Sequence, residues 1–137
     1  MYIEWVLAQV EQGDTEAKRK ASAIEGRWKN RLGSVMELTV SDQHRIDGTY
    51  QTGVGVIDTD ATFHVCGFVE GDAVAFVVDF GRLGSVASWS GHHVSDENGD
   101  RLLTLWHLAE RVRDPHNEAD TWGSLIAGSD EFVRLND

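Results

Sequence analysis

From residue 26 onward, apolar and polar side chains alternate along the chain, which is the period expected of β-strands with one buried face. In the segment 34–41, Ser34, Met36, Leu38 and Val40 share one face, and the residues between them are mostly polar. Alternation of this kind predicts eight strands. They lie at residues 27–31, 34–41, 45–52, 62–69, 73–80, 85–94, 101–109 and 124–134.

Short clusters of turn-forming residues, such as Glu70-Gly71-Asp72, separate most of these strands. The longest connection, residues 110–122, holds the only proline and is predicted to be a loop. Successive antiparallel strands with short turns are typical of an up-and-down barrel or a sandwich. A barrel of eight strands is wide enough to hold one small ligand.

Residues 1–25 have a different pattern, which we interpret as helical. Ile3, Trp5, Val6 and Val10 form a loose apolar stripe, Gly13 is predicted to end this helix, and a second turn is predicted at 16–21. The sequence therefore predicts a helical N-terminal extension at residues 1–25 and one β-domain at residues 26–137.

Several predicted inward faces are apolar in the middle and polar near one end. The polar residues are Asn30, Ser34, Tyr50, Thr52, Ser85 and Asp130. Buried polar groups without partners cost several kcal/mol, roughly 2–7 each. Because these residues share the inward faces with Trp89 and Trp106, we favour a pocket for a polar small molecule over a polar core that satisfies itself.

Apolar residues also lie on predicted outward faces. Ala73, Ala75 and Val77 face outward from one strand, and Leu103 and Leu105 from another. An exposed apolar barrel surface favours a subunit interface, although scattered apolar surface residues are the alternative.

The formal net charge of −11 argues against nucleic acid and anionic membranes as partners, since the only basic cluster is Lys18-Arg19-Lys20. The single cysteine, Cys66, excludes an intrachain disulfide. The six histidines show no spacing typical of a metal site, so we expect no metal.

Five segments of the chain together resemble the avidin and streptavidin family. They are residues 26–34 (GRWKNRLGS), residues 47–50 (DGTY) with Thr52 and Val54-Gly55 after them, Trp89-Ser90-Gly91, Trp106-His107-Leu108, and Trp122 followed by residues 128–132 (GSDEF). The resemblance covers residues 26–135. It implies an eight-stranded antiparallel up-and-down barrel that binds biotin and catalyses no reaction.

The resemblance also implies a role for each matched residue. Asn30, Ser34 and Tyr50 would donate hydrogen bonds to the ureido oxygen of biotin, and Thr52 and Asp130 would accept them from its two N–H groups. Phe80, Trp89, Trp106 and Leu108 would form the walls. Val54 and Gly55 would begin a lid loop, Ser85 would contact the tail carboxylate, and Trp122 would reach into the pocket of a neighbouring subunit. On this basis we expect a homotetramer, with a dimer as second choice, and biotin as ligand without any cofactor.

The chain departs from the family pattern at two pocket positions and at its N-terminus. Phe80 stands where the family usually has Trp, and Ala87 where it has a Thr whose hydroxyl faces the biotin sulfur, so weaker binding is expected. Residues 1–25 have no counterpart in the family. Their start does not resemble a secretory signal, which favours the cytoplasm, whereas avidins are generally secreted; the location is left open.

Three alternatives remain open from the sequence. The first is an enzyme on the same barrel, in which Asp130, Tyr50 and His93 supply acid–base chemistry. The second is a barrel that binds a different small molecule. The third is a purely structural oligomer without a displaceable ligand.

Overall fold

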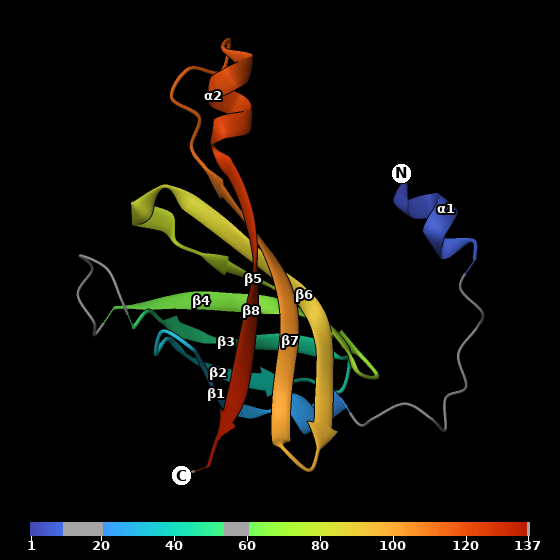
Figure 1. Ribbon diagram of the computed structural model, residues 1–137. Coiled ribbons are helices and arrows are strands. Elements are labelled where there is room, and N and C mark those ends of the chain that lie inside the picture. Colours follow the sequence, from blue (N-terminus) through green and yellow to red (C-terminus); the bar gives the residue numbers. More distant parts are fainter. Residues whose placement is uncertain (10–20, 54–60, 137) are drawn as a thin grey trace.

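The computed structural model describes residues 1–9, 21–53 and 61–136, and its main body is a closed β-barrel (Figure 1). The strands follow one another around the barrel in chain order, each antiparallel to its neighbours. They are β1 (Gly26–Asn30), β2 (Val35–Val40), β3 (Arg45–Gln51), β4 (Thr62–Glu70), β5 (Ala73–Asp79), β6 (Ser85–Asp96), β7 (Gly99–Glu110) and β8 (Leu125–Leu135). The predicted eight-stranded up-and-down barrel is thus confirmed, and each strand lies within two residues of its predicted bounds.

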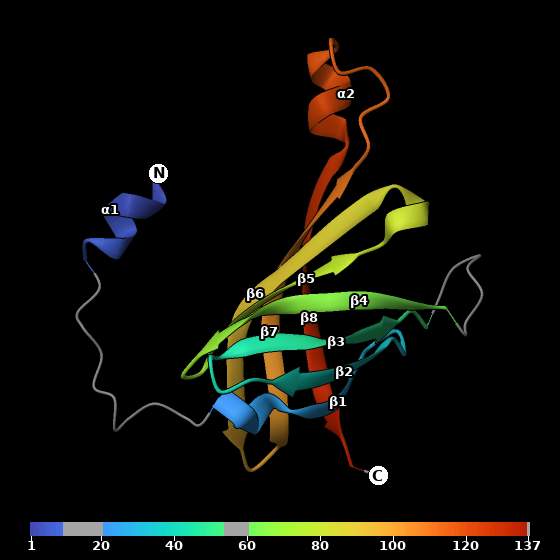
Figure 2. The same ribbon diagram turned by 180° about the vertical axis from the view of Figure 1, so that it is seen from behind.

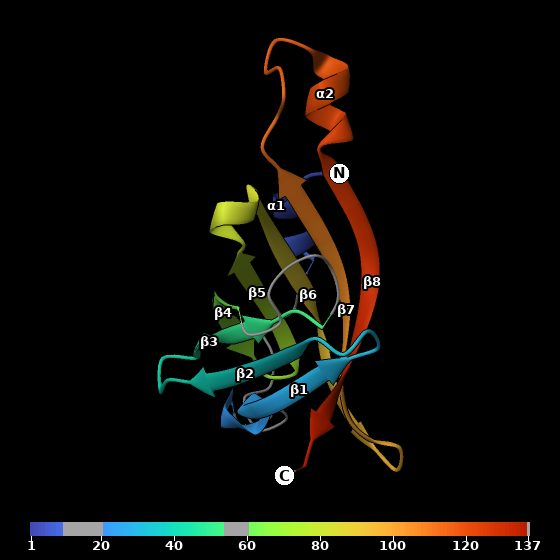
Figure 3. The ribbon, with the colours of Figure 1, turned by 90° about the vertical axis from the view of Figure 1, so that its left-hand side faces the viewer.

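The first and last strands pair with each other and so close the barrel. Their register runs from Arg27 opposite Leu135 to Asn30 opposite Phe132. The upper part of β8, from residue 125 to residue 131, pairs with β7. It continues past the end of β1 to carry α2 (Glu118–Gly123) beyond the rim (Figure 3). We call this the α2 end of the barrel.

The alternating pattern of the sequence becomes an alternating pattern of burial. In β5, Val74, Phe76 and Val78 are buried, while the residues between them are exposed. The largest fully buried side chains are Trp28, Phe76 and Phe132. The ring of Phe76 stacks on that of Trp89 with centroids 5.4 Å apart, so an aromatic layer fills the middle of the barrel.

The opposite end of the barrel is closed by the 3-10 helix η2 (Ala21–Ile24), and we call it the η2 end. Ile24 is fully buried, and its carbonyl accepts a 2.9 Å hydrogen bond from Nε1 of Trp28. Arg134 of β8 donates to the carbonyl oxygens of Ala23 and Glu25 and stacks on the ring of Trp28. These contacts attach η2 to both the first and the last strand.

A partly buried ion-pair cluster supports the same end. Arg134 Nε and His93 Nε2 both lie 2.8 Å from the Asp100 carboxylate. Burial alone would raise the pKa of Asp100, but the hydrogen bonds from Arg134, His93 and Ser95 outweigh it and hold the pKa at about 2. The ionised form of the Asp100 carboxylate is therefore more stable in the folded protein than in the unfolded chain.

Two helices differ from the sequence predictions. The first helix, α1 (Ile3–Leu7), ends well before Gly13, which lies outside the described residues, as does most of the predicted turn at 16–21. The loop predicted at residues 110–122 contains most of α2, whose first turn is capped by the Asn117 side chain accepting from the N–H groups of Ala119 and Asp120. None of the helices in the described part of the chain is long and apolar enough to cross a membrane.

We expect Asp100 to make the stability of the folded protein fall at low pH. Folding lowers the pKa of Asp100 from 3.8 to about 2. This shift contributes roughly 2 kcal/mol to the free energy of unfolding. The contribution is complete when the pH is above the pKa of the unfolded chain, and it is lost as the pH falls through the pKa of the folded protein. Urea unfolding of Asp100→Asn should show that loss at pH 6, and the gap to the original chain should narrow toward pH 2. Glu37→Gln, at an exposed outward position of β2, is the control and should change stability little. An undiminished gap at low pH would contradict the assignment.

Candidate functional site

Polar side chains gather inside the barrel toward the α2 end. Asn30 is the last residue of β1, and Ser34 directly precedes β2. Tyr50 lies near the end of β3, opposite Met36, and Asp130 lies in β8, opposite Thr104. The short hairpin between β1 and β2 brings Asn30 and Ser34 together, and the pairing of β1 with β8 brings Asp130 from the other end of the sequence to the same place.

Asn30 connects two parts of this cluster. Its Nδ2 donates a 3.1 Å hydrogen bond to Oδ2 of Asp130, and its Oδ1 accepts a 2.9 Å bond from the N–H of Ser34. The hydroxyl oxygen of Ser34 in turn accepts a 3.0 Å bond from the N–H of Gly53. The Asn30 amide is thereby fixed in orientation, and the side chains of Asn30 and Ser34 also hydrogen-bond the hydroxyl of Tyr50.

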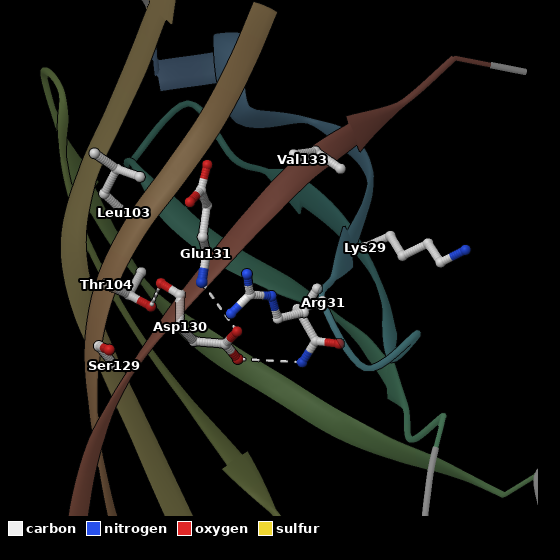
Figure 4. A pocket seen from close by; sticks show the side chains of 9 residues that line it. Lys29, Arg31, Leu103, Thr104, Ser129, Asp130, Glu131 and Val133 are labelled. Carbon is white, nitrogen blue, oxygen red and sulfur yellow. Dashed lines mark hydrogen bonds between the residues drawn. The ribbon is translucent and has the colours of Figure 1, made fainter.

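Asp130 is the acceptor at the centre of the cluster (Figure 4). Besides Asn30, its carboxylate accepts from the N–H of Glu131 at 3.0 Å and from Nε1 of Trp89 at 3.4 Å. Its carbonyl accepts from the hydroxyl of Thr104 at 2.9 Å. Three donors on one carboxylate hold a negative charge in a partly buried position and direct it toward the barrel interior.

The hydroxyl of Tyr50 is protonated at neutral pH, as a free phenol is, and its surroundings raise its pKa further. Burial raises the pKa of Tyr50 above its ordinary value; hydrogen bonding to Ser34 and Asn30 opposes this rise, and the negative charge of Asp130 adds to it. A phenol with a raised pKa is a hydrogen-bond donor at neutral pH. The cluster thus holds donors from Asn30, Ser34 and Tyr50 close to one carboxylate acceptor.

Aromatic rings surround the polar cluster. The ring of Tyr50 lies 5.4 Å from that of Trp89 and 5.8 Å from that of Phe80, measured between centroids. Trp106 pairs with Trp89 across β6 and β7, and its Nε1 donates to the carbonyl of Ser129. The arrangement offers flat apolar walls beside a small set of directed polar groups, which is typical of small-molecule sites.

Glycine at position 128 is required for Trp106 to lie where it does. A Cβ atom at Gly128 would lie 2.5 Å from the nearest ring atom of Trp106. The two residues face each other across β7 and β8. The close approach of backbone and ring therefore sets the position of one wall.

The remaining predicted site residues fall into three groups. Leu108 is half-buried beside Ala87 in the neighbouring strand, and Ser85, also half-buried, begins β6 at the α2 end. Thr52 follows β3 at the same end and is half-buried. Val54 and Gly55 lie outside the described residues.

Among the predicted site residues that the structure describes, Trp122 lies apart from the cluster. It belongs to α2, which projects beyond the rim, and 66% of its surface is exposed (Figure 1). Its side chain is consequently available to another molecule and does not line its own barrel's polar cluster.

Sequence reasoning missed four residues that shape the cluster. The N–H of Gly53 donates to the Ser34 hydroxyl, and the Thr104 hydroxyl donates to the carbonyl of Asp130. The ring of Phe63 packs on that of Phe80, and the ring of Phe76 stacks on that of Trp89. Phe76 and Thr104 stood on predicted inward faces, so the inward period could have identified them. The contact of Gly53 depends on a turn geometry that the period does not reveal.

His93 does not join Asp130 and Tyr50. It is 3% exposed, packs its ring against Trp28, and bonds Asp100 at the η2 end. In the described part of the chain, no three His, Cys, Asp or Glu residues are placed to hold a metal ion.

A hollow of about 730 Å³ opens on the outside of the seam between β1 and β8. It is lined by outward residues such as Lys29 and Arg31 and also by Asn30, Thr104 and Asp130 from the inward cluster (Figure 4). The end of the β1–β8 register at Asn30 explains why the wall is open here.

Comparison with known proteins agrees with this architecture. A model of the Avidin family matches residues 18–135. The crystal structure of xenavidin is similar with a TM-score of 0.71 and 27% sequence identity, over 85% of this chain and 100% of that one. A structure described as AVR2 is similar with a TM-score of 0.73 and 25% identity, over 87% of this chain and 100% of that one.

Gly128→Ala is expected to displace Trp106 and to destabilise the barrel by roughly 1–3 kcal/mol, since the added methyl group has no space. The measurement is thermal unfolding followed by near-ultraviolet circular dichroism. Gly123→Ala is the matched control, because nothing lies within 4 Å of a Cβ atom there. Equal melting temperatures for the two variants would show that Trp106 is free to move.

Proposed function

Because the chain belongs to the avidin family, we propose that it is a non-catalytic protein that binds biotin inside the barrel. The observation that carries the proposal is the hydrogen bond between Asn30 and Asp130, with Ser34 and Tyr50 beside it. A cyclic urea presents one strong acceptor and two donors, and this cluster presents donors together with a carboxylate acceptor.

The ureido oxygen would take the donors of the cluster. Asn30 has a second N–H, Ser34 a hydroxyl proton, and Tyr50 a phenol that stays protonated. Donors fixed in advance in a water-poor site favour a polarised oxygen and lose little entropy on binding.

The ureido N–H groups would donate to Asp130 and Thr52. An ionised acceptor strengthens the opposite pole of the same urea dipole, because charge-assisted hydrogen bonds are stronger than neutral ones. The bond from Trp89 to Asp130 supports the proposal, since it joins an apolar wall directly to the acceptor.

The remaining residues would enclose the ring and the tail. Trp89, Trp106, Leu108 and Phe80 would contact the bicyclic ring and alkyl chain, and Ser85 at the rim would meet the tail carboxylate. Val54 and Gly55 would begin the covering loop. Trp122, exposed on the projecting α2, would cover the pocket of a neighbouring subunit.

Ala87 favours a second candidate ligand. It is buried and faces Val78 and Leu108 across the neighbouring strands, so the wall beside it is apolar. A cyclic urea without the thioether sulfur would lose no hydrogen bond at position 87. We therefore expect weaker discrimination between biotin and its sulfur-free analogue than in a site with a hydroxyl at this position.

An enzyme on the same barrel has less support. The histidine that could serve as a base, His93, has its hydrogen bonds with Asp100 and, at its backbone, with Asp72. Binding without turnover fits the cluster of Asn30, Tyr50 and Asp130 better.

Isothermal titration with biotin tests the proposal. The original chain should bind close to one biotin per chain. Asp130→Asn should weaken binding by roughly ten- to 150-fold, which corresponds to the 1.5–3 kcal/mol of a charged hydrogen bond. Glu131→Gln is the matched control, because this neighbouring acid is exposed and pairs with Arg101 on the outside.

Two results would count against it. Absence of both binding heat and a biotin-dependent rise in melting temperature would exclude biotin as the ligand. Equal weakening by Asp130→Asn and Glu131→Gln would exclude a specific role for the inward carboxylate.

A homotetramer, with a dimer as second choice, is the assembly that we propose. Leu103 and Leu105 expose apolar surface on the outside of β7, and Trp122 projects from the rim. Mass measurement in solution should give four chains. Trp122→Ala should weaken biotin binding while leaving the melting temperature of the free protein nearly unchanged, since the side chain is mostly exposed within its own chain. A monomeric protein would contradict the proposed role of Trp122.

A further inference from the structure

The inner faces of β6 and β7 end in two polar residues at the α2 end of the barrel. Ser85, the first residue of β6, lies directly opposite Glu110, the last residue of β7. The next pair inward is Ala87 with Leu108, of which Ala87 is buried and Leu108 half-buried. Because side chains two residues apart in a strand share a face, Ser85 and Glu110 also belong to the inner face. Figure 2 shows β7 ending at this rim, where the chain leaves the barrel for α2.

Backbone hydrogen bonds fix the end of β7 on both sides. The N–H of Glu110 donates to the carbonyl of Ser124 at 2.8 Å. The N–H of Arg111, one residue further on, donates to the carbonyl of Gly84 at 2.8 Å. Residues directly opposite each other in an antiparallel pair have Cβ atoms about 4.5–5.5 Å apart. The Ser85 hydroxyl and the Glu110 carboxylate are therefore held close together at the mouth of the barrel.

The protein itself does not use these two polar groups. Within the part of the chain that the structure describes, no hydrogen bond or ion pair engages the Ser85 hydroxyl or the Glu110 carboxylate. The neighbouring cation, Arg111, lies against Gly84, where a Cβ atom would lie 2.6 Å from its Nε. Ser85 is half-buried and Glu110 is exposed, so both can meet a molecule that extends out of the barrel.

The tail of a ligand held by the polar cluster would reach this rim along β7. Thr104, which bonds the backbone of the cluster, is followed on the inner face by Trp106, Leu108 and Glu110. Trp106 and Leu108 offer an apolar wall that suits an alkyl chain. Glu110 lies four residues, roughly 13 Å, beyond Trp106. The far end of an alkyl tail would therefore meet Ser85 and Glu110 together.

A hydroxyl beside a carboxylate complements a secondary amide better than a free acid. The carbonyl oxygen of an amide accepts from the Ser85 hydroxyl, while its N–H donates to Glu110. The second of these bonds is charge-assisted and therefore stronger than a neutral one. An ionised acid offers acceptors only, and it places a second negative charge beside Glu110, which disfavours its binding.

We propose that Ser85 and Glu110 make the mouth of the barrel selective for a ligand whose tail ends in an amide, formed between its carboxyl group and an amine, over the free acid. The inference rests on the proposed function, because it takes the ureido ring of the same ligand to lie at Asn30 and Asp130. Ser85 serves either tail, whereas Glu110 favours the amide. Glu110 is thus the specificity-determining residue for the tail.

Competition titration with three forms of biotin tests the proposal: the N-methylamide, the methyl ester and the free acid. The ester is uncharged like the amide but has no N–H, so the comparison of amide with ester measures the bond to Glu110. The original chain should bind the amide roughly three- to tenfold more tightly than the ester, as one net hydrogen bond gives. Glu110→Ala should bring this ratio close to one and should raise the affinity for the free acid.

Glu118→Ala is the matched control, because Glu118 is an exposed acid in the first turn of α2 at the same end of the barrel. It removes the same charge and the same side chain without touching the inner face. It should leave the amide-to-ester ratio as it is in the original chain. Melting temperatures of the free variants should agree, since both side chains are exposed.

Three results would overturn the proposal. Biotin binding with an amide-to-ester ratio near one in the original chain, or with a ratio that Glu110→Ala does not change, would remove the role of Glu110 and leave the proposed function intact. An equal loss of the ratio in Glu118→Ala would assign the selectivity to the general charge of the rim. Absence of binding by all three ligands would overturn the proposed function itself and this inference with it.

Discussion

The closure of the barrel depends on the contact of its first strand with its last, and the hydrogen bond from Asn30 to Asp130 lies where this contact ends. It joins residues 100 positions apart, next to the last paired residues of β1 and β8. A partly buried amide or carboxylate left without a partner would cost about 1–3 kcal/mol. The same bond orients Asn30 toward Ser34 and Asp130 toward Trp89. The constraint that closes the fold is therefore also the one that arranges the polar cluster.

The two ends of the barrel differ in structure: the η2 end is packed closed, and the α2 end holds the polar cluster. The η2 end is filled by Ile24 and fastened by Arg134, whose guanidinium contacts Trp28, Asp100 and the backbone of η2. The α2 end keeps directed donors and acceptors beside aromatic walls. Between them, the stacked rings of Phe76 and Trp89 form a common floor. A site on such a floor is held by packing that does not depend on the ligand, which favours preorganised binding.

The alternation of apolar and polar residues predicted the strands and their inward faces. It did not predict contacts between residues that only the closure of the barrel brings together. All eight strands were predicted within two residues because alternate residues are alternately buried, and the cluster of Asn30, Ser34, Tyr50 and Asp130 followed from polar residues on inward faces. Helix α2 was missed, because six residues fixed by one Asn117 cap show no apolar stripe. The hydrogen bonds from Arg134 to the backbone of η2 were also missed, since they join residues more than 100 positions apart. The ligand roles of the site residues stay predictions.

The most direct test of the account is a crystal structure of the protein grown with biotin. The account predicts density inside the barrel at the α2 end, with the ureido oxygen hydrogen-bonded by Asn30, Ser34 and Tyr50 and a ureido N–H donating to Asp130. Biotin bound elsewhere on the molecule, or an interior in which these four side chains bond only one another at saturating biotin, would contradict it.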